Sequence, residues 1–489
     1  MPFFDSKKNF NDTKLLFLGR VGVGLGQIAS MRIITGIVSP AEIGRFYYIL
    51  AIGGILNCIL FQPFIFYITK IFLVWFKDFV GKVRLLSILK LLVITALVFV
   101  VVFYIFWHFL QEKDKIELTF FALLPILMLT LSLIGIGNSI FILLKMKKMF
   151  IMLDNALIWG NLLFILTCVV IFKNTAEMML LGQLVSQVVI LSVVIYLLRK
   201  VMYNNKQDRD GSKIDWNEVW VFCWPVSIMQ ILFWAQNYGF RIPLKITGGD
   251  YNLGIFSVTF GITTALFALF HSLFTQLYDP IFWKSVADNG HKSSDLNSYM
   301  ANHWPYLILF TFWVVGISVN ALTVMAAGKY SQYFYLIILI SIGEFFRHLC
   351  DCFSNSTFAI NNNKTFILVG LSSFIICLGG TYYLGLIIDP IMATIISLTV
   401  AHISDLVLLA ISVKKKVNFK LPLRQSGIAA MFGVILAGVI FLINKIGLSF
   451  TVFGSLATLG VGGMLFILFA YLLSRVLQSY NLKEVKSHG

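Results

Sequence analysis

The sequence predicts an all-α polytopic membrane protein, because its composition is strongly apolar and its apolar segments are long. Hydrophobic residues make up 59% of the 489-residue chain, charged residues make up only 12%, and the mean hydropathy is +0.88. These values are typical of polytopic membrane proteins and exclude the soluble globular classes. At roughly 20 residues per crossing, we expect about fourteen spans. They lie near residues 15–37, 46–68, 91–110, 118–144, 149–172, 178–198, 219–240, 255–282, 303–327, 333–360, 365–385, 388–411, 426–445 and 452–474.

The distribution of lysine and arginine predicts the orientation of these spans. Positively charged residues concentrate in the cytoplasmic connections of membrane proteins. Most of the 38 Lys and Arg residues fall on the side of the two termini, so we expect both termini to be cytoplasmic. The net charge of +16 is then explained by the Lys and Arg residues of the cytoplasmic connections, which also attract anionic membrane lipids. We therefore expect no nucleic-acid partner. The opposite connections carry only Arg45, Lys113, Lys115, Lys173, Lys245, Lys329 and Lys445.

A weak internal repeat predicts that the first twelve spans form two lobes. In each copy an arginine at the outer end of a span precedes a short loop, a glycine and an aromatic-rich helix. Arg32 precedes Gly44 in this way, and Arg241 precedes Gly254. Because both copies start in the cytoplasm, a pseudo-two-fold axis along the membrane normal would relate two six-helix lobes. We expect an N-lobe at 1–200 (spans 1–6), a cytoplasmic linker at 201–212, a C-lobe at 213–412 (spans 7–12), and a C-terminal helix hairpin with its tail at 413–489 (spans 13–14).

The tenth expected span carries four ionisable residues, Glu344, Arg347, His348 and Asp351. Their spacing places all four on one face of a helix. A charge at bilayer depth costs at least ~2.5–3.5 kcal/mol, so we expect this face to meet protein or water inside a bundle. Such a stripe indicates a protein that moves a polar substance across a membrane. The structural alternative is that Arg347 pairs with Asp351, and Glu344 with His348, each four residues apart.

Further polar residues predict a binding site for an anionic group. The seventh span would present one polar and aromatic face ending at Arg241, and the first would carry Arg20 near its inner end and Arg32 at its outer end. A guanidinium group stays charged and forms forked bonds with phosphate or carboxylate, so an anionic head group is the expected cargo. Near a helix end, an arginine can also extend to the interface for structural reasons alone. The candidate substrate-binding residues are Arg347, Arg32, Arg20, Arg241, Gln27, Gln230, Trp234 and Asn237.

Carboxylates within the spans are candidates for exchanging a coupling ion, either a proton or a sodium ion. Asp154 lies near the start of the fifth span, and Asp405 follows His402 by three residues in the twelfth. Hydrogen bonding to neighbouring helices is the structural alternative for both. No nucleotide-binding loop, metal-ligand cluster or nucleophile is apparent in the sequence, so we expect no catalytic residues, no metal site and no cofactor. The candidate ion-coupling residues are Glu344, Asp351, His348, Asp154 and Asp405.

Two segments resemble bacterial oligosaccharide flippases of the multidrug/oligosaccharidyl-lipid/polysaccharide exporter superfamily. The stretch from Arg32 to Gly53 is similar to their opening signature, in which a first helix ends in arginine and a Pro-x-x-x-Gly loop leads to an aromatic second helix. The stretch from Gln236 to Ser257 resembles the matching segment of their second lobe. One position differs, because the family commonly has an aspartate where Phe240 precedes Arg241.

The resemblance implies an O-antigen-type flippase of lipopolysaccharide or polysaccharide biosynthesis. Such a protein would move an undecaprenyl-diphosphate-linked oligosaccharide from the inner to the outer leaflet of the bacterial cytoplasmic membrane by alternating access through an arginine-lined cavity. Arg347, with Arg20 and Arg32, would receive the anionic head, and Glu344 and Asp351 would reset the cycle by ion exchange. A glycan polymerase and a chain-length regulator are the implied protein partners.

Three alternatives have different chemistry. A drug/cation antiporter of the same superfamily would share the layout but favour acidic residues in its cavity. A flippase for the lipid-linked peptidoglycan precursor would share both the span number and the cationic cavity. A membrane glycan polymerase or glycosyltransferase would be an enzyme, but such enzymes usually carry a substantial outer domain, whereas the outer connections here are short, as at 111–117.

Overall fold

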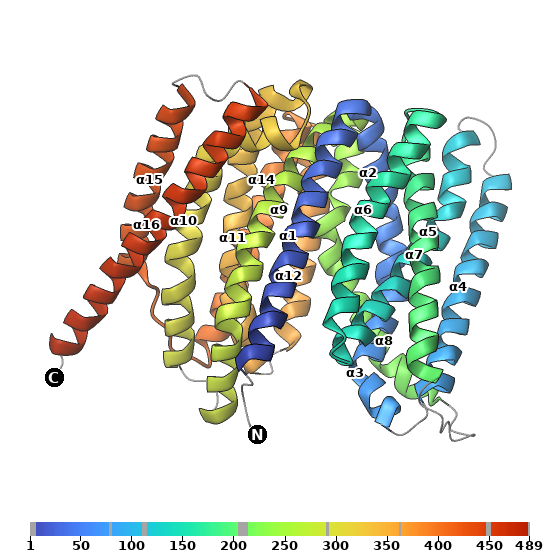
Figure 1. Cartoon of the computed structure of the whole chain (residues 1–489), viewed down its shortest axis with the longest axis horizontal. Helices are drawn as coiled ribbons and strands as arrows, with labels where there is room; N and C mark the ends of the chain where they lie inside the picture. Colours follow the sequence, from blue (N-terminus) through green and yellow to red (C-terminus); the bar gives the residue numbers. More distant parts are fainter. Residues whose placement is uncertain are drawn as a thin grey trace. The chain divides into compact units, whose positions relative to one another are not determined.

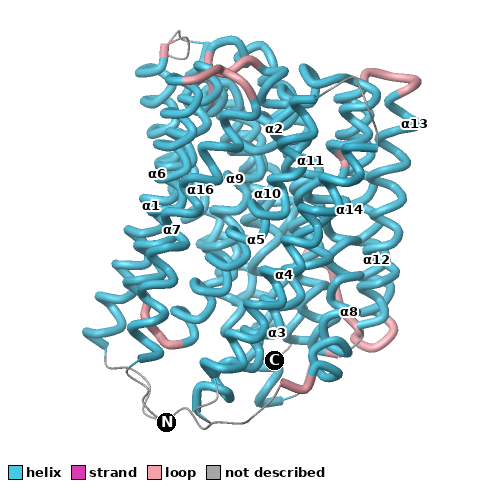
Figure 2. The backbone as a smooth tube through the Cα atoms, turned by 90° about the vertical axis from the view of Figure 1, so that its right-hand side faces the viewer, coloured by secondary structure: helices cyan, strands magenta, loops and turns pink. Residues whose placement is uncertain are grey.

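A computed structural model describes residues 6–77, 81–109, 115–203, 214–289, 293–360, 363–445 and 451–487. Every secondary structure element in these ranges is a helix, so the predicted all-α class is confirmed for them (Figures 1 and 2). The helices group into two compact units, Met1–Ile242 and Pro243–Gly489. We call these the first and the second unit.

The first unit contains α1 to α8 and two short π-helical turns, η1 and η2. Their bounds are α1 (Ser6–Ile37), α2 (Pro40–Leu56), η1 (Asn57–Phe61), α3 (Gln62–Lys77), α4 (Gly81–Phe109), α5 (Lys115–Leu143), α6 (Lys147–Ile171), α7 (Ala176–Tyr203), α8 (Trp216–Trp234) and η2 (Ala235–Gly239).

The second unit contains the remaining helices, and its boundary falls two residues into the first of them. Their bounds are α9 (Arg241–Asn289), α10 (Ser293–Met325), the 3-10 turn η3 (Gly328–Tyr333), α11 (Phe334–Ala359), α12 (Asn363–Ile375), the π turn η4 (Ile376–Gly380), α13 (Thr381–Gly385), α14 (Pro390–Lys414), α15 (Leu423–Lys445) and α16 (Val452–Ser487).

Apolar packing of α5, α6 and α7 forms a core in the first unit. Gly182 brings α7 close to α6, because a Cβ at this position would lie only 2.6 Å from the Cα of Ile165 and from the carbonyl oxygen of Phe164. Apolar residues in such close contact gain dispersion energy over many atom pairs. The core comprises Ile134, Phe141, Leu153, Ile190 and Val194.

The contacts of α8 group it with the first unit. This helix packs against α3 and η1, although the sequence repeat predicts that it opens the C-lobe at 213–412. The predicted lobes rest on the repeat and not on helix contacts, so their bounds and their symmetry stay a prediction. The predicted linker at 201–212 lies mostly outside the described residues.

Helices α10 and α11 form the centre of the second unit. Helix α10 packs against α11, α15 and α16, and α11 packs against α14. The long α9 is two helices separated at Gly249, whose φ of +73° is accessible to glycine at no steric cost. The part of α9 after this break supplies residues of the site described below.

Eleven stretches of the described residues are long and apolar enough to cross a membrane. One of them, Trp216–Asp288, contains two of the expected spans, 219–240 and 255–282. Helix α11 is not among the eleven, and it is the helix that carries the stripe of ionisable residues. Each expected segment coincides with helix over most of its length. The number of fourteen crossings itself stays a prediction.

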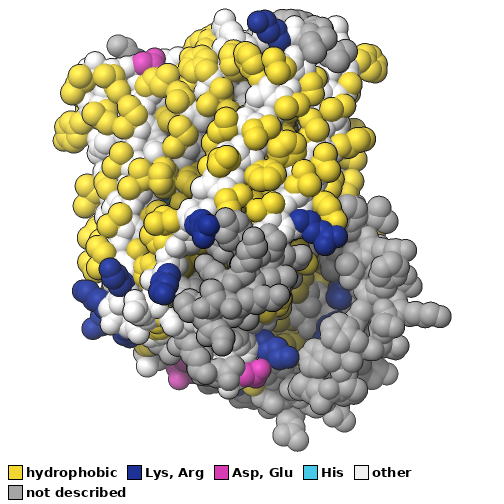
Figure 3. All heavy atoms as spheres, turned by 90° about the vertical axis from the view of Figure 1, so that its left-hand side faces the viewer, with side chains coloured by type: hydrophobic (Ala, Val, Ile, Leu, Met, Phe, Trp, Pro, Cys, Tyr) yellow, Lys and Arg dark blue, Asp and Glu magenta, His cyan; other side chains and the backbone are white. Residues whose placement is uncertain are grey.

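The outward-facing side chains of α15 and α16 are apolar. Figure 3 shows the face that carries these helices, with hydrophobic side chains over most of it and Lys and Arg residues at its borders. Met431, Phe441, Phe453 and Met464 are 68%, 66%, 86% and 73% exposed. Apolar surface of this extent suits hydrocarbon and not water as its surroundings. The chain therefore folds as a multi-pass membrane protein.

Candidate functional site

The ionisable stripe of α11 faces the interior of the second unit, as its spacing predicts. Glu344 and His348 are buried, whereas the side chains of Arg347 and Asp351 are 30% and 31% exposed. The guanidinium Nη2 of Arg347 lies 2.7 Å from Oε2 of Glu344. The alternative pairing of Arg347 with Asp351 is therefore wrong, because the side chain of Arg347 turns back toward Glu344, three residues earlier in the helix. The Nε2 of His348 lies 3.8 Å from the same Glu344 oxygen.

Asp351 is shared by two imidazole rings from different helices. Its Oδ2 lies 3.0 Å from Nδ1 of His348 and 3.1 Å from Nδ1 of His271, which extends from α9. The two rings have centroids 5.0 Å apart, and the ring of Phe267 stacks parallel to that of His348. His271 is not among the residues that the sequence predicts for the site. Its position as a lone histidine within an apolar span could have indicated a site residue, because ionisable residues at membrane depth usually face a bundle interior.

A carboxylate of α9, Asp279, extends this polar region along the second unit. Its Oδ1 accepts a hydrogen bond of 2.6 Å from the hydroxyl of Tyr299 on α10 and one of 3.4 Å from the amide of Asn355 on α11. Close by, Nδ1 of His303 lies 3.2 Å from the sulfur of Cys352. These donors stabilise the partly buried carboxylate, because an unpaired charge is costly away from water. None of these contacts was predicted from the sequence.

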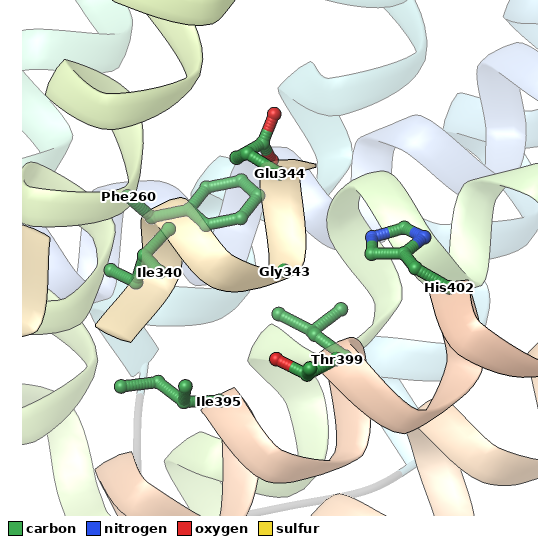
Figure 4. Close-up of a pocket in the computed structure, with 8 residues that line it drawn as sticks. Phe260, Ile340, Gly343, Glu344, Ile395, Thr399 and His402 are labelled. Carbon is green, nitrogen blue, oxygen red and sulfur yellow. The ribbon is translucent and has the colours of Figure 1, made fainter. Parts of the chain in front are cut away.

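Helix α14 contributes the predicted residues His402 and Asp405. Asp405 accepts a hydrogen bond from the hydroxyl of Ser373 on α12, and its Oδ2 lies 4.0 Å from Nδ1 of His402. His402 and Glu344 border a small cavity between α9, α11 and α14, together with Phe260, Ile340 and Thr399 (Figure 4). The cavity volume of about 10 Å³ is close to what one water molecule requires.

In the first unit, a predicted substrate-binding residue pairs with a predicted ion-coupling residue. The Nη1 of Arg20 on α1 lies 3.2 Å from Oδ2 of Asp154 on α6, and the two side chains are 54% and 25% exposed. Gln27 is exposed on α1, and Arg32 is half-buried near the end of the same helix. The structure thus places Arg20 and Asp154 together on an accessible part of the first unit.

Arg241 lies in an aromatic box and is only 6% exposed. Its guanidinium carbon lies 5.3 Å, 5.1 Å and 5.1 Å from the ring centroids of Tyr47, Tyr238 and Phe240. Its Nη1 donates a hydrogen bond to the carbonyl oxygen of Asn237. Arginine stacks well on aromatic faces, so the box stabilises the buried charge.

The predicted polar face of the seventh span is divided. Trp234 is buried and donates an indole hydrogen bond of 2.9 Å to the carbonyl of Ala51, whereas Asn237 is exposed and Gln230 is half-buried. The π turn η2 lies between Trp234 and Arg241, and each such turn carries one residue more than an α-helix. The α-helical spacing used for the prediction therefore does not hold across 235–239.

Comparison with solved structures identifies the fold. The chain is similar to the lipid II flippase MurJ in an inward closed conformation, with a TM-score of 0.71, 14% identity, and 96% of this chain and 99% of that chain covered. It is also similar to an inward-facing multidrug resistance MATE family transporter of the MOP superfamily, with a TM-score of 0.57, 12% identity, and 86% and 95% coverage. For the eukaryotic MATE transporter AtDTX14 the TM-score is 0.51, with 12% identity and 87% and 99% coverage.

No protein-family profile and no curated protein sequence matches the chain. At the identities above, the likeness to solved structures establishes the fold alone. The chain therefore has the fold shared by MurJ and the MATE transporters, and these three solved proteins are transporters and a flippase rather than enzymes.

Proposed function

We propose that this protein is a flippase that moves an undecaprenyl-diphosphate-linked oligosaccharide from the inner to the outer leaflet of the bacterial cytoplasmic membrane. The observation that carries the proposal is the likeness to a lipid II flippase over nearly the whole length of both chains. The two segments that resemble oligosaccharide flippases favour a glycan-bearing lipid over a drug. Alternating access between inward- and outward-open states would supply the transport step.

The diphosphate of such a lipid is the group that arginine recognises best. A guanidinium group binds phosphate oxygens in pairs and keeps its charge in a membrane. Arg347 and Arg20 fit this role, because their side chains are 30% and 54% exposed and each is held by one carboxylate that an anionic ligand could replace. We also assign Arg32 to the anionic head. Arg241, which is buried in its aromatic box, would position the neighbouring helix.

The polar neutral residues would contact the sugars. Gln27 and Asn237 are exposed and can offer amide groups to hydroxyls, and Gln230 is half-buried. Trp234 is buried and would support this surface from within. The residues proposed to exchange a coupling ion, with H⁺ or Na⁺ as the ion, are Glu344, His348, Asp351, Asp154 and Asp405.

The proposal includes a location and partners. Both termini would lie in the cytoplasm, as the distribution of Lys and Arg predicts. A glycan polymerase and a chain-length regulator would receive the product at the outer leaflet, because a single flipped repeat unit must be joined to others.

The test is surface glycan display in a strain that lacks the endogenous protein. Arg347→Ala should lower surface glycan at least tenfold at equal membrane expression and cause the lipid-linked intermediate to accumulate, and Arg347→Lys should restore little because it cannot form the forked contact. Arg475→Ala is the matched control, since Arg475 is exposed on α16 and contacts Tyr471. Full display with Arg347→Ala would refute the assignment of the head-group site.

A flippase for the lipid-linked peptidoglycan precursor is the second candidate. It is favoured by the MurJ likeness itself, since that protein is a lipid II flippase. Complementation of a strain depleted of its lipid II flippase separates the two. Rescue of growth there, without an effect on surface glycan in the first strain, would assign the peptidoglycan precursor as substrate.

A further inference from the structure

Three donor atoms of the second unit converge on one point. One ring nitrogen each of His271 and His348 and a carboxylate oxygen of Asp351 all lie within 4.8 Å of one another. The Nδ1 atoms of the two histidines lie 3.1 Å and 3.0 Å from Oδ2 of Asp351. The donors come from two helices, α9 and α11, so the residues are distant in the sequence. Donor atoms at this spacing can share one ion, since zinc forms bonds of ~2.0–2.2 Å with nitrogen and oxygen.

This donor set selects a class of ion. Two imidazoles and one carboxylate suit divalent transition-metal ions such as Zn²⁺ and Co²⁺. Ca²⁺ and Mg²⁺ prefer sets made of oxygen, and the two imidazoles supply none. Asp351 would be the single charged ligand.

A carboxylate lies near the second ring nitrogen of His348, although not at hydrogen-bond distance. A metal-binding histidine commonly directs its second ring nitrogen to a carboxylate, which orients the ring. Here Nε2 of His348 lies 3.8 Å from Oε2 of Glu344, and Glu344 is held in turn by Arg347 at 2.7 Å. Phe267 stacks on the imidazole with an interplanar angle of 4° and so fixes its plane.

Carboxylates outnumber arginines around the three donors. Asp279 and Arg347 both interact electrostatically with His271. Asp351 and Glu344 are further carboxylates of α11, and Arg347 contacts Glu344. When both imidazoles are neutral, as metal ligands must be, a divalent ion lowers the net negative charge of this region, and buried charges are stable when they are paired or coordinate a metal.

The site has one closed and one open side. His348 is 5% exposed, whereas His271 and Asp351 are 36% and 31% exposed. An ion can therefore enter past His271, and a fourth coordination position remains for water.

We propose that His271, His348 and Asp351 bind one divalent transition-metal ion that links α9 to α11. While this ion is bound, His348 and Asp351 serve as its ligands, and exchange of H⁺ or Na⁺ falls to the other proposed carboxylates. The proposal concerns binding alone and does not depend on which lipid the protein transports. Its test therefore uses the purified full-length protein and a readout that involves no transport.

The protein is treated with chelator in detergent, passed through a desalting column, and titrated with Co²⁺ and, in competition with a chromophoric chelator, with Zn²⁺. We expect one ion per chain and visible Co²⁺ absorption typical of low coordination numbers. His271→Ala and Asp351→Asn should each weaken binding at least about tenfold, and Glu344→Gln by about 10- to 100-fold through the lost orientation of His348.

His303→Gln is the matched control, because His303 is a buried histidine of α10 that lies beside Cys352 and outside the donor group. It should bind the ion within about threefold of the unchanged protein. Gel filtration and melting of each variant show whether it folds, and the partly exposed His271 is the safest site to change. Absence of stoichiometric binding, unchanged affinity in His271→Ala, or equal loss in His303→Gln would each overturn the proposal.

Discussion

The two units handle polar side chains within their helices in different ways. In the first unit, charged groups meet in separate pairs, as between Arg45 and Glu177 at 3.0 Å or between Arg20 and Asp154 at 3.2 Å. In the second unit, the carboxylate of Asp351 contacts two histidines, His271 of α9 and His348 of α11. The ion pair of Arg347 and Glu344 lies on the same helix α11. The first arrangement ties one helix to another through each pair. The second brings several ionisable groups into contact, which is the arrangement that the proposed ion binding uses.

The largest expected effect comes from breaking the buried pair of the first unit. The side chain of Glu177 is only 5% exposed and joins α7 to Arg45 on α2. Removing one partner of a buried pair costs about 3–5 kcal/mol, because the other charge is left uncompensated. We expect Glu177→Ala to lower the free energy of unfolding by this amount, measured by denaturant titration in mixed micelles.

Removing both charges is the control for that experiment. Arg45→Met combined with Glu177→Leu leaves no isolated charge and should recover most of the loss. If Glu177→Ala alone cost less than about 1 kcal/mol, the pair would behave as an exposed pair and the contrast between the units would fail.

A smaller effect is expected from crowding the contact between α6 and α7. The Cβ of Gly182→Ala would lie 2.6 Å from backbone atoms of α6, which cannot move aside as a side chain can. Overpacking of this kind costs about 1–3 kcal/mol. Gly24→Ala is the control, because a Cβ there meets no atom within 4 Å. Equal unfolding free energies for the two variants would show that α6 and α7 pack less closely than described.

Asp351→Asn should cost less stability than either change in the first unit. The two imidazoles lose a charged acceptor, but the negative charge that Asp351 places among buried groups of α11 is also removed. We expect a net loss of about 1 kcal/mol in the free energy of unfolding and a marked loss of surface glycan at unchanged expression. A stability loss as large as that of Glu177→Ala would mean that Asp351 acts mainly as a structural residue.

The smallest effect is expected for Asp154→Ala. The ion pair with Arg20 is largely exposed, and exposed pairs contribute about 0.2–1 kcal/mol. Stability should therefore change by no more than this, whereas Arg20→Ala should reduce glycan display if Arg20 binds the diphosphate. A defect in Arg20→Ala alone in the display assay would support diphosphate binding by Arg20. Equal defects in both variants would mean that transport needs the ion pair or the proposed ion exchange at Asp154.

Much of the fold follows from the sequence because membrane helices obey strong local rules. The length of apolar segments predicts where helices lie, and the helical period predicts that the polar stripe of α11 faces inward. Both predictions are confirmed for the described residues. These rules act along one helix, so a single sequence is sufficient to apply them.

The partners of the site residues could not be predicted, because they depend on packing between helices. His271 has apolar neighbours in the sequence and becomes notable only when α9 places it against Asp351. By its spacing, Arg347 could pair with either Glu344 or Asp351. The rotamer of its side chain, which places it against Glu344, cannot be read from the sequence. The grouping of α8 with the first unit likewise depends on its contacts with α3 and η1.

The π turn η2 has a consequence for comparing this sequence with distant relatives. Such a turn is equivalent to a one-residue insertion in an α-helix, which rotates everything after it by about 100°. A homologue that lacks the extra residue would present the position aligned with Arg241 on a different side of its helix. Alignments that allow no gap at 235–239 would then equate residues that occupy unlike surroundings, and the arginine would look misplaced in one of the two proteins.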